Sequence, residues 1–385
     1  MNEAIKNKVP HITVVASYFY PKVGGLETIA YTTAKMLQDS GEYTVSIISS
    51  NYDGKGYRKD IINGMTVHRL PIAFRLSNTP INFAWSKMIA RIFDEEKPAI
   101  VHTHSPVPFM ADVAAAVAHR KHIPLVVTYH SGSMRKGNVV LDFIIGVYES
   151  YFLKKLLERA DHIVAVARNF IPVVFPQFMD KVSFIPTGVD LERFKKTPVP
   201  SNERVAFVGR VELSSMWKGI EYLIKAMAIV IRKHPNATLE IVGGGDALDL
   251  YKQQAVTAGI NENFITPGPQ YGEDLVKAFE RMEVMVLPST SDSEAFSVSL
   301  VEAMASGRPI IGTNIGGTPQ VIDNGDTGLI VEPKNPEALA EAIERVLSDH
   351  AFAQALGDAG ASKAQAFSWE IQTGKYREIF KSLIA

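Results

Sequence analysis

Residues 284–309 read VMVLPSTSDSEAFSVSLVEAMASGRP. The apolar run Val284–Leu287 leads into a polar loop and then into a stretch with helical spacing that ends at Gly307. A buried strand followed by a loop and a helix is the repeating unit of open α/β sheets, and ligands bind at such loops. The carboxylates Glu294 and Glu302 flank the helix start. On one helix they would be about 80° apart, so we expect Glu294 in the loop and Glu302 in the helix.

The composition is that of a globular protein large enough for two domains. The chain has 385 residues, of which 46% are hydrophobic and 21% charged, and one hydrophobic core seldom organises so many. No apolar run approaches the roughly 18 residues that span a bilayer, and the first ten residues do not form a signal-peptide core. The absence of cysteine excludes disulfides and thiolate metal sites. We therefore expect a cytoplasmic protein.

Charge is distributed unevenly along the chain. Residues 1–195 contain 23 basic and 17 acidic side chains, whereas residues 196–385 contain 17 basic and 24 acidic ones, for a total of −1. This balance argues against a general nucleic-acid-binding protein. It is compatible with a basic first half that faces an anionic surface, and also with chance.

Short apolar strands alternate with helical patterns along both halves. In the first half they are 11–16, 45–49, 99–103, 125–129, 163–166 and 182–185; in the second they are 205–208, 238–242, 264–266, 284–287, 309–312 and 328–331. Such alternation is typical of parallel sheets covered on both faces. We predict an α/β protein with two Rossmann-like domains, at 1–194 and 204–368, joined by a proline-containing linker at 195–203. The last helix, within 369–385, either completes the second domain or returns to the first.

Two basic residues lie at the first strand of the second half. Arg210 follows the strand 205–208, and Lys218 precedes the next helix. Because a helix N-terminus already favours anions, two cations gathered there suit a bound diphosphate. Solvated surface cations are the alternative.

Glycine-rich turns and the absence of other motifs narrow the chemistry. Gly243-Gly244-Gly245 and Gly316-Gly317 follow strands, where glycine lets backbone approach a ligand or simply turn tightly. Neither is a dinucleotide fingerprint, and there is no Walker A sequence. No metal-ligand spacing occurs. We expect no cofactor and no metal, so that Arg210, Lys218 and helix N-termini neutralise a leaving diphosphate.

In the first half, candidate residues follow three strands. Gly24-Gly25 opens the helix after the first strand and can offer amides to a phosphate or sugar. His104 and His130 come at the ends of two later strands, the second directly after Tyr129. An imidazole there can hold a hydroxyl group or move its proton, although a lone histidine is often structural. His104 and Tyr129 are candidates for the acceptor side.

The segment 139–157 carries a broad apolar face. Its members are Val140, Leu141, Ile144, Ile145, Tyr148, Phe152 and Leu156, with Arg135-Lys136 before them and Lys154-Lys155 near the end. A core helix explains this pattern. A membrane-surface helix whose basic residues contact lipid head groups is the second interpretation.

Taken in order, the motifs resemble those of the retaining GT-B glycosyltransferases of family four, the group 1 glycosyl transferases. The resemblance covers nearly the whole chain. It consists of Gly24-Gly25-Leu26-Glu27, His104, His130, Pro186-Thr187-Gly188-Val189-Asp190, Gly209-Arg210 with Lys218-Gly219, the Glu294 to Glu302 motif, and Gly316-Gly317 through Gly325-Asp326-Thr327-Gly328. Thr187 departs from the family, which often has asparagine there, so no role is carried over to that side chain.

The resemblance implies a fold and a set of residue roles. It implies two Rossmann-like domains whose parallel sheets face each other across an interdomain cleft, with the last helix returning to the N-terminal, acceptor-binding domain. It implies that Arg210 and Lys218 hold the donor diphosphate, that Glu302 takes the ribose hydroxyls and that Glu294 contacts the transferred sugar. Further implied contacts are the amides of Phe296, Ser297 and Val298, those of Gly24 and Gly25, and His130 near the donor sugar or acceptor hydroxyl.

The implied activity is a metal-independent, retaining hexosyltransferase that moves a sugar from a UDP- or GDP-linked donor to an acceptor hydroxyl. Front-face displacement needs leaving-group stabilisation more than a strong base. A glycan, glycolipid or envelope-polysaccharide acceptor and peripheral contact with the inner face of an anionic membrane are expected. A phosphorylase or epimerase of the same architecture, or a non-catalytic nucleotide-sugar-binding subunit, are the alternatives.

Overall fold

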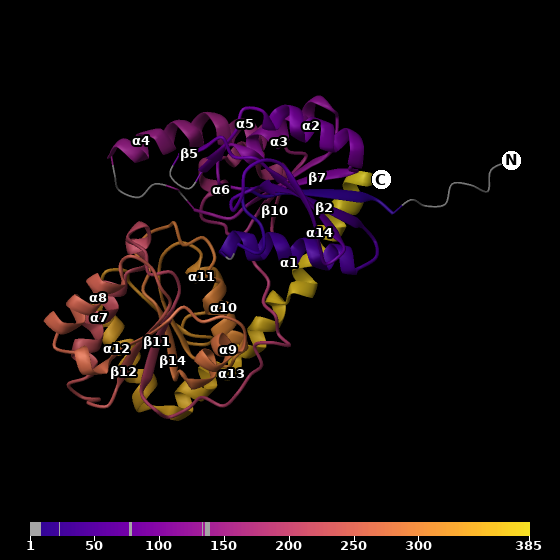
Figure 1. Cartoon of the computed structure of the whole chain (residues 1–385). Helices are drawn as coiled ribbons and strands as arrows, with labels where there is room; N and C mark the ends of the chain where they lie inside the picture. The colour runs from indigo at the N-terminus through magenta and orange to yellow at the C-terminus, as the bar shows by residue number, and fades with distance from the viewer. Residues whose placement is uncertain (1–8, 23, 77–78, 133, 135–138) are drawn as a thin grey trace. The chain divides into compact units, whose positions relative to one another are not determined.

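The computed structural model describes the chain except for residues 1–8, 23, 77–78, 133 and 135–138. It divides into two compact units, which are described separately below (Figure 1). Unit 1 comprises residues 1–187 together with 369–385, and unit 2 comprises residues 188–368. Both are α/β with parallel sheets, so the predicted fold class is confirmed.

Unit 1 is built on one eight-stranded sheet. Its strand order is β10-β9-β8-β7-β1-β2-β4-β3, parallel except for the β3–β4 hairpin at one edge. The strands are β1 (His11–Val15), β2 (Thr44–Ser50), β3 (Arg58–Ile62), β4 (Met65–Leu70), β7 (Ile100–Ser105), β8 (Leu125–Tyr129), β9 (His162–Ala165) and β10 (Val182–Phe184); β5 (Phe74–Leu76) and β6 (Thr79–Ile81) form a separate hairpin. The order reverses between β1 and β7, which is where open α/β sheets bind ligands.

Alternation along the strands gives this sheet two apolar faces. Val14 packs in the core that includes α1 (Gly25–Asp39) and α14 (Trp369–Ile384), whereas Val15 packs in the core that includes α2 (Trp85–Glu96) and α3 (Met110–Arg120). Val126 and Val127 divide in the same way. The core on the second face also includes buried residues from the C-terminal part of a long helical segment. That segment runs through α4 (Val139–Val147), η1 (Tyr148–Leu153) and α5 (Lys154–Arg159), and the short helices α6 (Ile171–Val174) and η2 (Pro176–Lys181) follow it.

The last helix belongs to unit 1. α14 contacts α1 and β7, and the two helices α1 and α14 lie side by side (Figure 1). Tyr376 and Phe380 are buried in the core beneath them, and Arg377 forms an ion pair with Glu42. Between the two interpretations of its sequence, the structure places this helix on the first unit.

Unit 2 has a six-stranded, wholly parallel sheet with the order β13-β12-β11-β14-β15-β16. Its strands are β11 (Arg204–Val208), β12 (Thr238–Val242), β13 (Phe264–Gly268), β14 (Val284–Leu287), β15 (Ile310–Thr313) and β16 (Leu329–Val331). Its helices are η3 (Leu213–Lys218), α7 (Ile220–Val230), α8 (Leu248–Thr257), η4 (Asn261–Asn263), α9 (Gly272–Arg281), α10 (Val298–Ala305), α11 (Thr318–Val321), α12 (Pro336–Ser348), α13 (His350–Ala364) and η5 (Gln365–Phe367).

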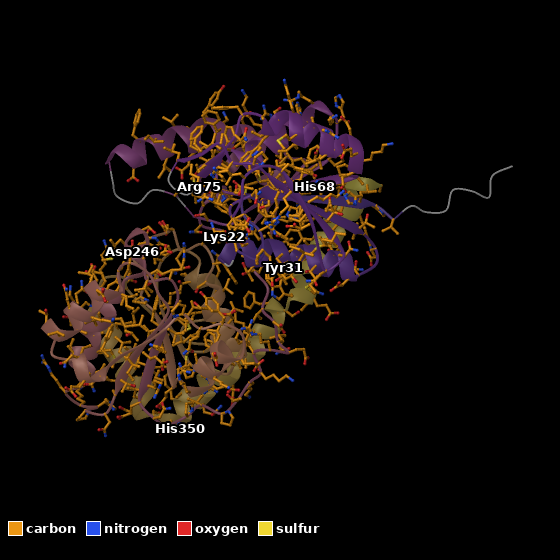
Figure 2. All side chains as sticks on the ribbon, in the orientation of Figure 1. Lys22, Tyr31, His68, Arg75, Asp246 and His350 are labelled. Carbon is orange, nitrogen blue, oxygen red and sulfur yellow. The ribbon has the colours of Figure 1, made fainter. Side chains whose placement is uncertain are left out.

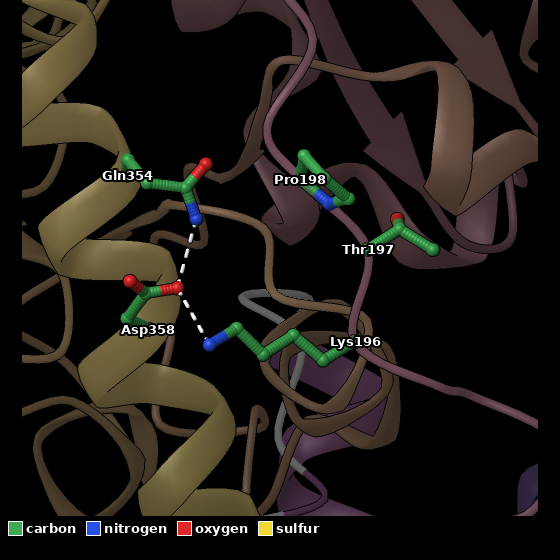
Figure 3. A pocket seen from close by; sticks show the side chains of 5 residues that line it. All are labelled: Lys196, Thr197, Pro198, Gln354 and Asp358. Atoms are coloured by element: carbon green, nitrogen blue, oxygen red, sulfur yellow. Dashed lines mark hydrogen bonds and ion pairs between the residues drawn. The ribbon is translucent and has the colours of Figure 1, made fainter.

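The segment 195–203, expected to be a linker, is instead packed into unit 2. Lys196 forms an ion pair with Asp358 at 2.8 Å (Figure 3), and Val199 N–H donates to Gln354 Oε1. The fully buried Arg308 donates to Thr197 and to the Pro198 carbonyl. Prolines and polar residues indicated an irregular segment correctly, but these distant partners anchor it. The boundary between the units therefore lies earlier, at residues 187 and 188.

Candidate functional site

The strand order of unit 2 reverses between β11 and β14, which places the ends of these two strands at the sheet's switch point. β11 ends at Val208 and leads into Gly209-Arg210. β14 ends at Leu287 and leads into the loop that carries Glu294. The two stretches singled out in the sequence therefore meet at one edge of one sheet.

A buried ion pair forms the centre of this edge. Lys218 Nζ donates to Glu294 Oε2 at 3.0 Å, and Ser289 Oγ donates to the same oxygen at 3.0 Å. The side chains of Lys218 and Glu294 are only 12% and 8% exposed. Burying charged groups is unfavourable unless they are paired. This cation and carboxylate, paired and largely desolvated at the switch point, therefore form a polar site.

The loop that carries Lys218 is fixed to the end of β14 by backbone contacts. Thr290 N–H donates to the Trp217 carbonyl at 2.7 Å. Gly219 has φ +72°, and a Cβ there would lie 2.0 Å from the Pro288 carbonyl oxygen. Only glycine permits both this backbone conformation and this approach. The lysine is also steadied by the Trp217 ring, whose centroid is 4.7 Å from Nζ.

Arg210 lies at the same edge but is exposed. Its side chain is 65% exposed, and among the described residues its one polar side-chain contact is from Nη1 to the Glu212 carboxylate, at 3.4 Å. Gly209, next to it, is overlaid by the Lys218 side chain, since an added Cβ would lie 3.8 Å from Lys218 Cδ. Arg210 therefore has a free guanidinium edge available for an anion.

The glycine-rich turns serve loop packing rather than an open backbone. A Cβ on Gly317 would lie 1.6 Å from the Ala295 carbonyl oxygen, and Gly317 N–H donates to the Glu294 carbonyl at 2.8 Å. Gly243 meets the Gly209 carbonyl just as closely. These glycines let neighbouring loops press against the 209 and 294 segments and hold them in place. This packing explains the glycines, so the suggested approach of their backbone to a ligand is not needed.

Helix α10 follows the loop that carries Glu294 and contains Glu302. It begins at Val298, so Glu294 lies in the preceding loop, and Ser297 caps the helix by accepting from Leu300 N–H at 3.4 Å. The amides of the first turn have no intrahelical partner and favour an anion. Within the helix Glu302 is largely buried, and burial raises its pKa to about 7, against the lowering effect of the nearby Arg193.

In unit 1 the two predicted histidines form a hydrogen-bonded pair. His104 Nδ1 and His130 Nε2 are 2.8 Å apart, at the ends of the neighbouring strands β7 and β8. Burial lowers the pKa of His130 to about 3 and that of His104 well below its usual value. The pair is thus neutral near pH 7 and shares one N–H between its rings. Within the described part of the chain, His130 Nδ1 and His104 Nε2 are buried atoms with no hydrogen-bond partner.

A second set of polar contacts lies next to the His104–His130 pair. His102 Nε2 is 2.7 Å from Thr128 Oγ1, which is 3.2 Å from the Tyr376 hydroxyl of α14. His102 and His104 are two residues apart on β7, and Thr128 of β8 is the register partner of His104, so the three side chains lie on the same sheet face. The C-terminal helix therefore supports the row of residues that ends at His130.

The other residues predicted in unit 1 are Tyr129, Gly24 and Gly25, and their surroundings differ from those of the two histidines. Tyr129 is 1% exposed, stacks on Phe170 and donates its hydroxyl to the Gly132 carbonyl. Its side chain is part of the opposite core, so we remove it from the acceptor side. Gly24 is the N-cap of α1 with φ −179°, and Gly25 begins the helix.

Sequence reasoning missed the residues that hold the site together. Ser289 and Trp217 fix Glu294 and Lys218, and Arg193 opposes the raised pKa of Glu302. Ser289 had one available signal, since it comes two residues after the β14 strand. Trp217 is the sequence neighbour of Lys218, whereas Arg193 and Glu302 are far apart in sequence.

Two family models match the chain in succession. Residues 23–193 match the model described as "Glycosyltransferase Family 4", and residues 189–363 match "Glycosyl transferases group 1". Together they contain the His104–His130 pair and the Lys218–Glu294 pair.

Relatives and solved structures agree with these models. An uncharacterised glycosyltransferase of Methanocaldococcus jannaschii is 28% identical over 93% of this chain and 95% of its own length. A D-rhamnosyltransferase of Pseudomonas aeruginosa is 28% identical over 87% of this chain and 85% of its own. Among solved structures, the Anabaena protein HepE in complex with UDP-glucose has a TM-score of 0.74 at 19% identity, covering 97% of this chain and 99% of that one. At this identity the structural likeness concerns the fold.

Proposed function

Because the chain belongs to the group 1 glycosyltransferases of GT-B fold, we propose that it is a metal-independent, retaining hexosyltransferase that uses a UDP- or GDP-linked sugar. The observation that carries the proposal is the buried Lys218–Glu294 pair at the switch point of unit 2. A solved protein of this fold binds UDP-glucose, which supports a nucleotide-sugar donor. The acceptor is a hydroxyl of a glycan, glycolipid or envelope precursor.

The chemistry of the site indicates which residues bind each part of the donor. The diphosphate takes Lys218 and the exposed edge of Arg210, with the amides of residues 296–298, at and just before the start of α10, beside it. Glu294 accepts from hydroxyls of the transferred sugar, and Glu302 accepts from the ribose. Lys218 is held by Glu294 in the free protein, so one carboxylate orients both the cation and the sugar.

The reaction needs charge stabilisation rather than a strong base. The bond between the anomeric carbon and the diphosphate oxygen breaks, the acceptor oxygen bonds to that carbon from the same face, and the acceptor proton passes to the departing phosphate. Lys218 and Arg210 stabilise the negative charge that develops on the diphosphate. On the other substrate, the neutral His130 positions a hydroxyl through Nδ1, and Gly24 and Gly25 offer amides.

A thermal-shift screen tests the proposal directly. Ligands that bind only the folded state raise its melting temperature. We expect UDP or GDP, and its sugars, to do so with and without EDTA, and expect Arg210→Ala to reduce the shift. A protein that responds to no nucleotide, or only when a divalent metal is added, would contradict this donor and metal assignment. Binding without any turnover would favour a non-catalytic subunit.

Glu302 makes donor affinity depend on pH. Ribose hydroxyls donate to the carboxylate form, whereas burial holds the pKa of Glu302 in the free protein at about 7. Binding must therefore displace a proton below that pH, and nucleotide affinity rises as the pH rises through 7. We expect about 10-fold weaker binding at pH 6 than at pH 8, measured by calorimetry. Glu302→Gln should flatten this profile; an unchanged slope in that variant would remove Glu302 from the ribose contact.

We also propose that the helical segment 143–159 contacts an anionic membrane surface. Both interpretations of this segment hold in part, because Leu153, Leu156 and Leu157 are buried whereas Phe143 is 73% exposed. Other exposed apolar side chains on it are Ile144, Val147, Tyr151 and Phe152, and Lys154 and Lys155 adjoin them. Arg135, Lys136, Val140 and Leu141 lie outside the residues whose side chains the structure describes. In the described part of the chain no helix has the length and apolarity to cross a bilayer.

Vesicle sedimentation tests this surface. At low salt, we expect the protein to bind phosphatidylglycerol vesicles better than phosphatidylcholine vesicles. Phe143→Asp should weaken that binding at least about tenfold, because a buried phenylalanine contributes roughly 2 kcal/mol. Val256, which is 64% exposed on α8 of unit 2, supplies the control Val256→Asp. Equal loss in both variants, or no vesicle binding by the wild type, would end this proposal.

A further inference from the structure

A desolvated cation lies beside two tyrosines at the ends of β1 and β2. Lys22 Nζ is 3.2 Å from the ring centroid of Tyr18 and 5.9 Å from that of Tyr52. The two rings meet edge to face, with centroids 6.5 Å apart. Burial lowers the pKa of Lys22, and within the described chain this ammonium forms no ion pair. Aromatic faces attract a cation but do not neutralise its charge.

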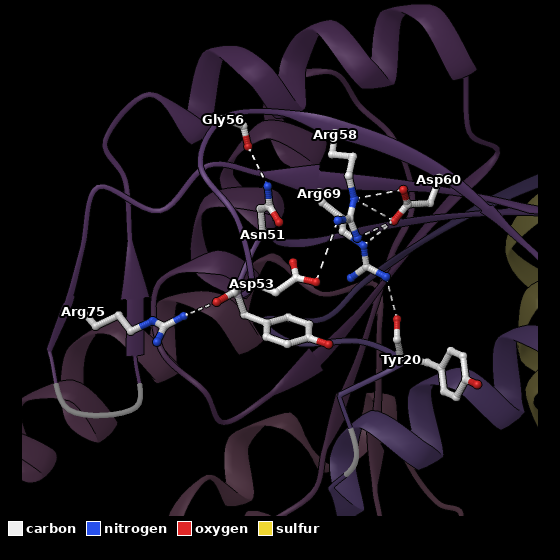
Figure 4. Close-up of polar contacts among 9 residues, drawn as sticks. Tyr20, Asn51, Asp53, Gly56, Arg58, Asp60, Arg69 and Arg75 are labelled. Atoms are coloured by element: carbon white, nitrogen blue, oxygen red, sulfur yellow. Dashed lines mark hydrogen bonds and ion pairs between the residues drawn. The ribbon is translucent and has the colours of Figure 1, made fainter.

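A second cation faces the same tyrosines. Arg75 of β5 donates from Nη2 to the Tyr52 carbonyl at 2.8 Å (Figure 4). Figure 2 labels both Lys22 and Arg75 on unit 1. The positive charge of Arg75 lowers the pKa of Lys22, but the carboxylate of Glu27 has a larger, opposite effect; burial, the largest cause, keeps the pKa below its usual value. Two cations and one nearby carboxylate leave a net positive charge beside these tyrosines, which favours a bound anion.

The neighbouring carboxylates are already occupied. The fully buried Arg69 donates to Asp60 Oδ2 at 2.6 Å and to the Tyr20 carbonyl at 2.6 Å, which holds the loop that carries Tyr18 and Lys22 (Figure 4). Arg58 shares Asp60 and lies 3.8 Å from Asp53. Asp53 and Asp60 therefore pair with Arg58 and Arg69, and among the described residues Glu27 is the carboxylate that acts on Lys22.

We propose that Lys22 and Arg75, with Tyr18 and Tyr52, form a subsite for an anionic group of the acceptor. The group is a phosphate monoester or a carboxylate carried on a sugar or polyol ring. Lys22 and Arg75 bind the anion, and the partly exposed Tyr52 packs against the ring.

The subsite's position relates it to the chemistry of unit 1. Because β1 pairs with both β2 and β7, the loops after β1 and β2 lie on the same sheet edge as His104 of β7. The inference rests on the proposed function, since it makes this edge an acceptor site, and it narrows the acceptors to anionic ones.

Ligand-observed NMR on the full-length protein tests this subsite without any transfer reaction. The probes are glucose 6-phosphate and glucuronate, with glucose as the neutral counterpart and inorganic phosphate as the anion without a ring. We expect the two anionic sugars to bind, glucose to bind at least about tenfold more weakly, and phosphate to lie between them. Lys22→Met and Arg75→Met should each weaken the anionic sugars by at least about tenfold.

Lys59→Met supplies the matched control, because Lys59 is an exposed lysine on β3 of the same unit. It should bind the probes like the wild type, and all three variants should bind UDP or GDP normally. Equal binding of glucose and its anionic forms, equal loss in Lys59→Met, or loss of nucleotide binding in Lys22→Met would each overturn the subsite. If no nucleotide binds but Lys22 still controls the anionic sugars, the subsite stands and the glycosyltransferase proposal falls.

Discussion

Replacing Lys218 by alanine is expected to lower kcat by at least about tenfold, and removing a single preorganised donor can cost about 100-fold. The reason is that Lys218 is the buried cation of unit 2's switch point, 12% exposed and paired with Glu294. Without it, the charge that develops on the departing diphosphate is left to Arg210. Initial rates of nucleotide release at saturating donor measure the effect.

The controls for this variant separate chemistry from folding. Lys218→Met keeps the apolar stem beside Trp217 and should lose as much activity as the alanine variant. Lys225→Ala removes an exposed lysine of α7 in the same unit and should leave the rate unchanged. Melting temperatures show whether Glu294 tolerates the loss of its partner, because an unpaired buried charge is destabilising. A near-normal rate in Lys218→Met would remove this residue from leaving-group stabilisation.

Replacing Glu294 by glutamine is expected to lower kcat/KM by about 10- to 100-fold, the loss typical of one hydrogen bond to a charged group. The amide keeps the size of the side chain and can still accept from Ser289. It loses the charge that orders Lys218 and that accepts from sugar hydroxyls. Because the nucleotide does not contact Glu294 in our proposal, the affinity for UDP or GDP alone should change much less than the affinity for the nucleotide sugar.

Glu344→Gln is the matched control for this prediction. Glu344 is also a largely buried carboxylate paired with a lysine, 2.6 Å from Lys233, but it lies on α12. That variant should retain full kcat/KM. If Glu294→Gln weakened the free nucleotide and the nucleotide sugar equally, Glu294 would be a nucleotide contact or a structural residue and not the sugar contact.

The regular parts of the fold could be predicted from local sequence. All twelve expected strands are present, because β-branched apolar runs of three to six residues have few alternatives to a buried parallel strand. The hairpin β3–β4 was missed. β3 is polar and mostly exposed at the sheet edge, and β4 contains His68 and Arg69, whose burial depends on Glu96 and Asp60 from elsewhere in the chain.

The sequence predicted which residues belong to the site, but not how those residues contact one another. Arg210, Lys218 and Glu294 could be singled out because they follow strands of a parallel sheet. The pairing of Lys218 with Glu294 joins residues 76 positions apart and depends on the strand order, which periodicity does not contain. The same holds for the segment 195–203, whose irregular sequence gives no sign of Arg308 and Gln354.

The most direct test of the central claim is a proton NMR time course of donor turnover by the purified protein, using whichever nucleotide sugar raises its melting temperature. With water as the acceptor, the account predicts slow release of the sugar, first as the same anomer that the donor carries, with EDTA present. First release of the opposite anomer would contradict the retaining mechanism. A donor that binds but is never cleaved, with any acceptor supplied, would contradict the assignment of this chain as a catalyst.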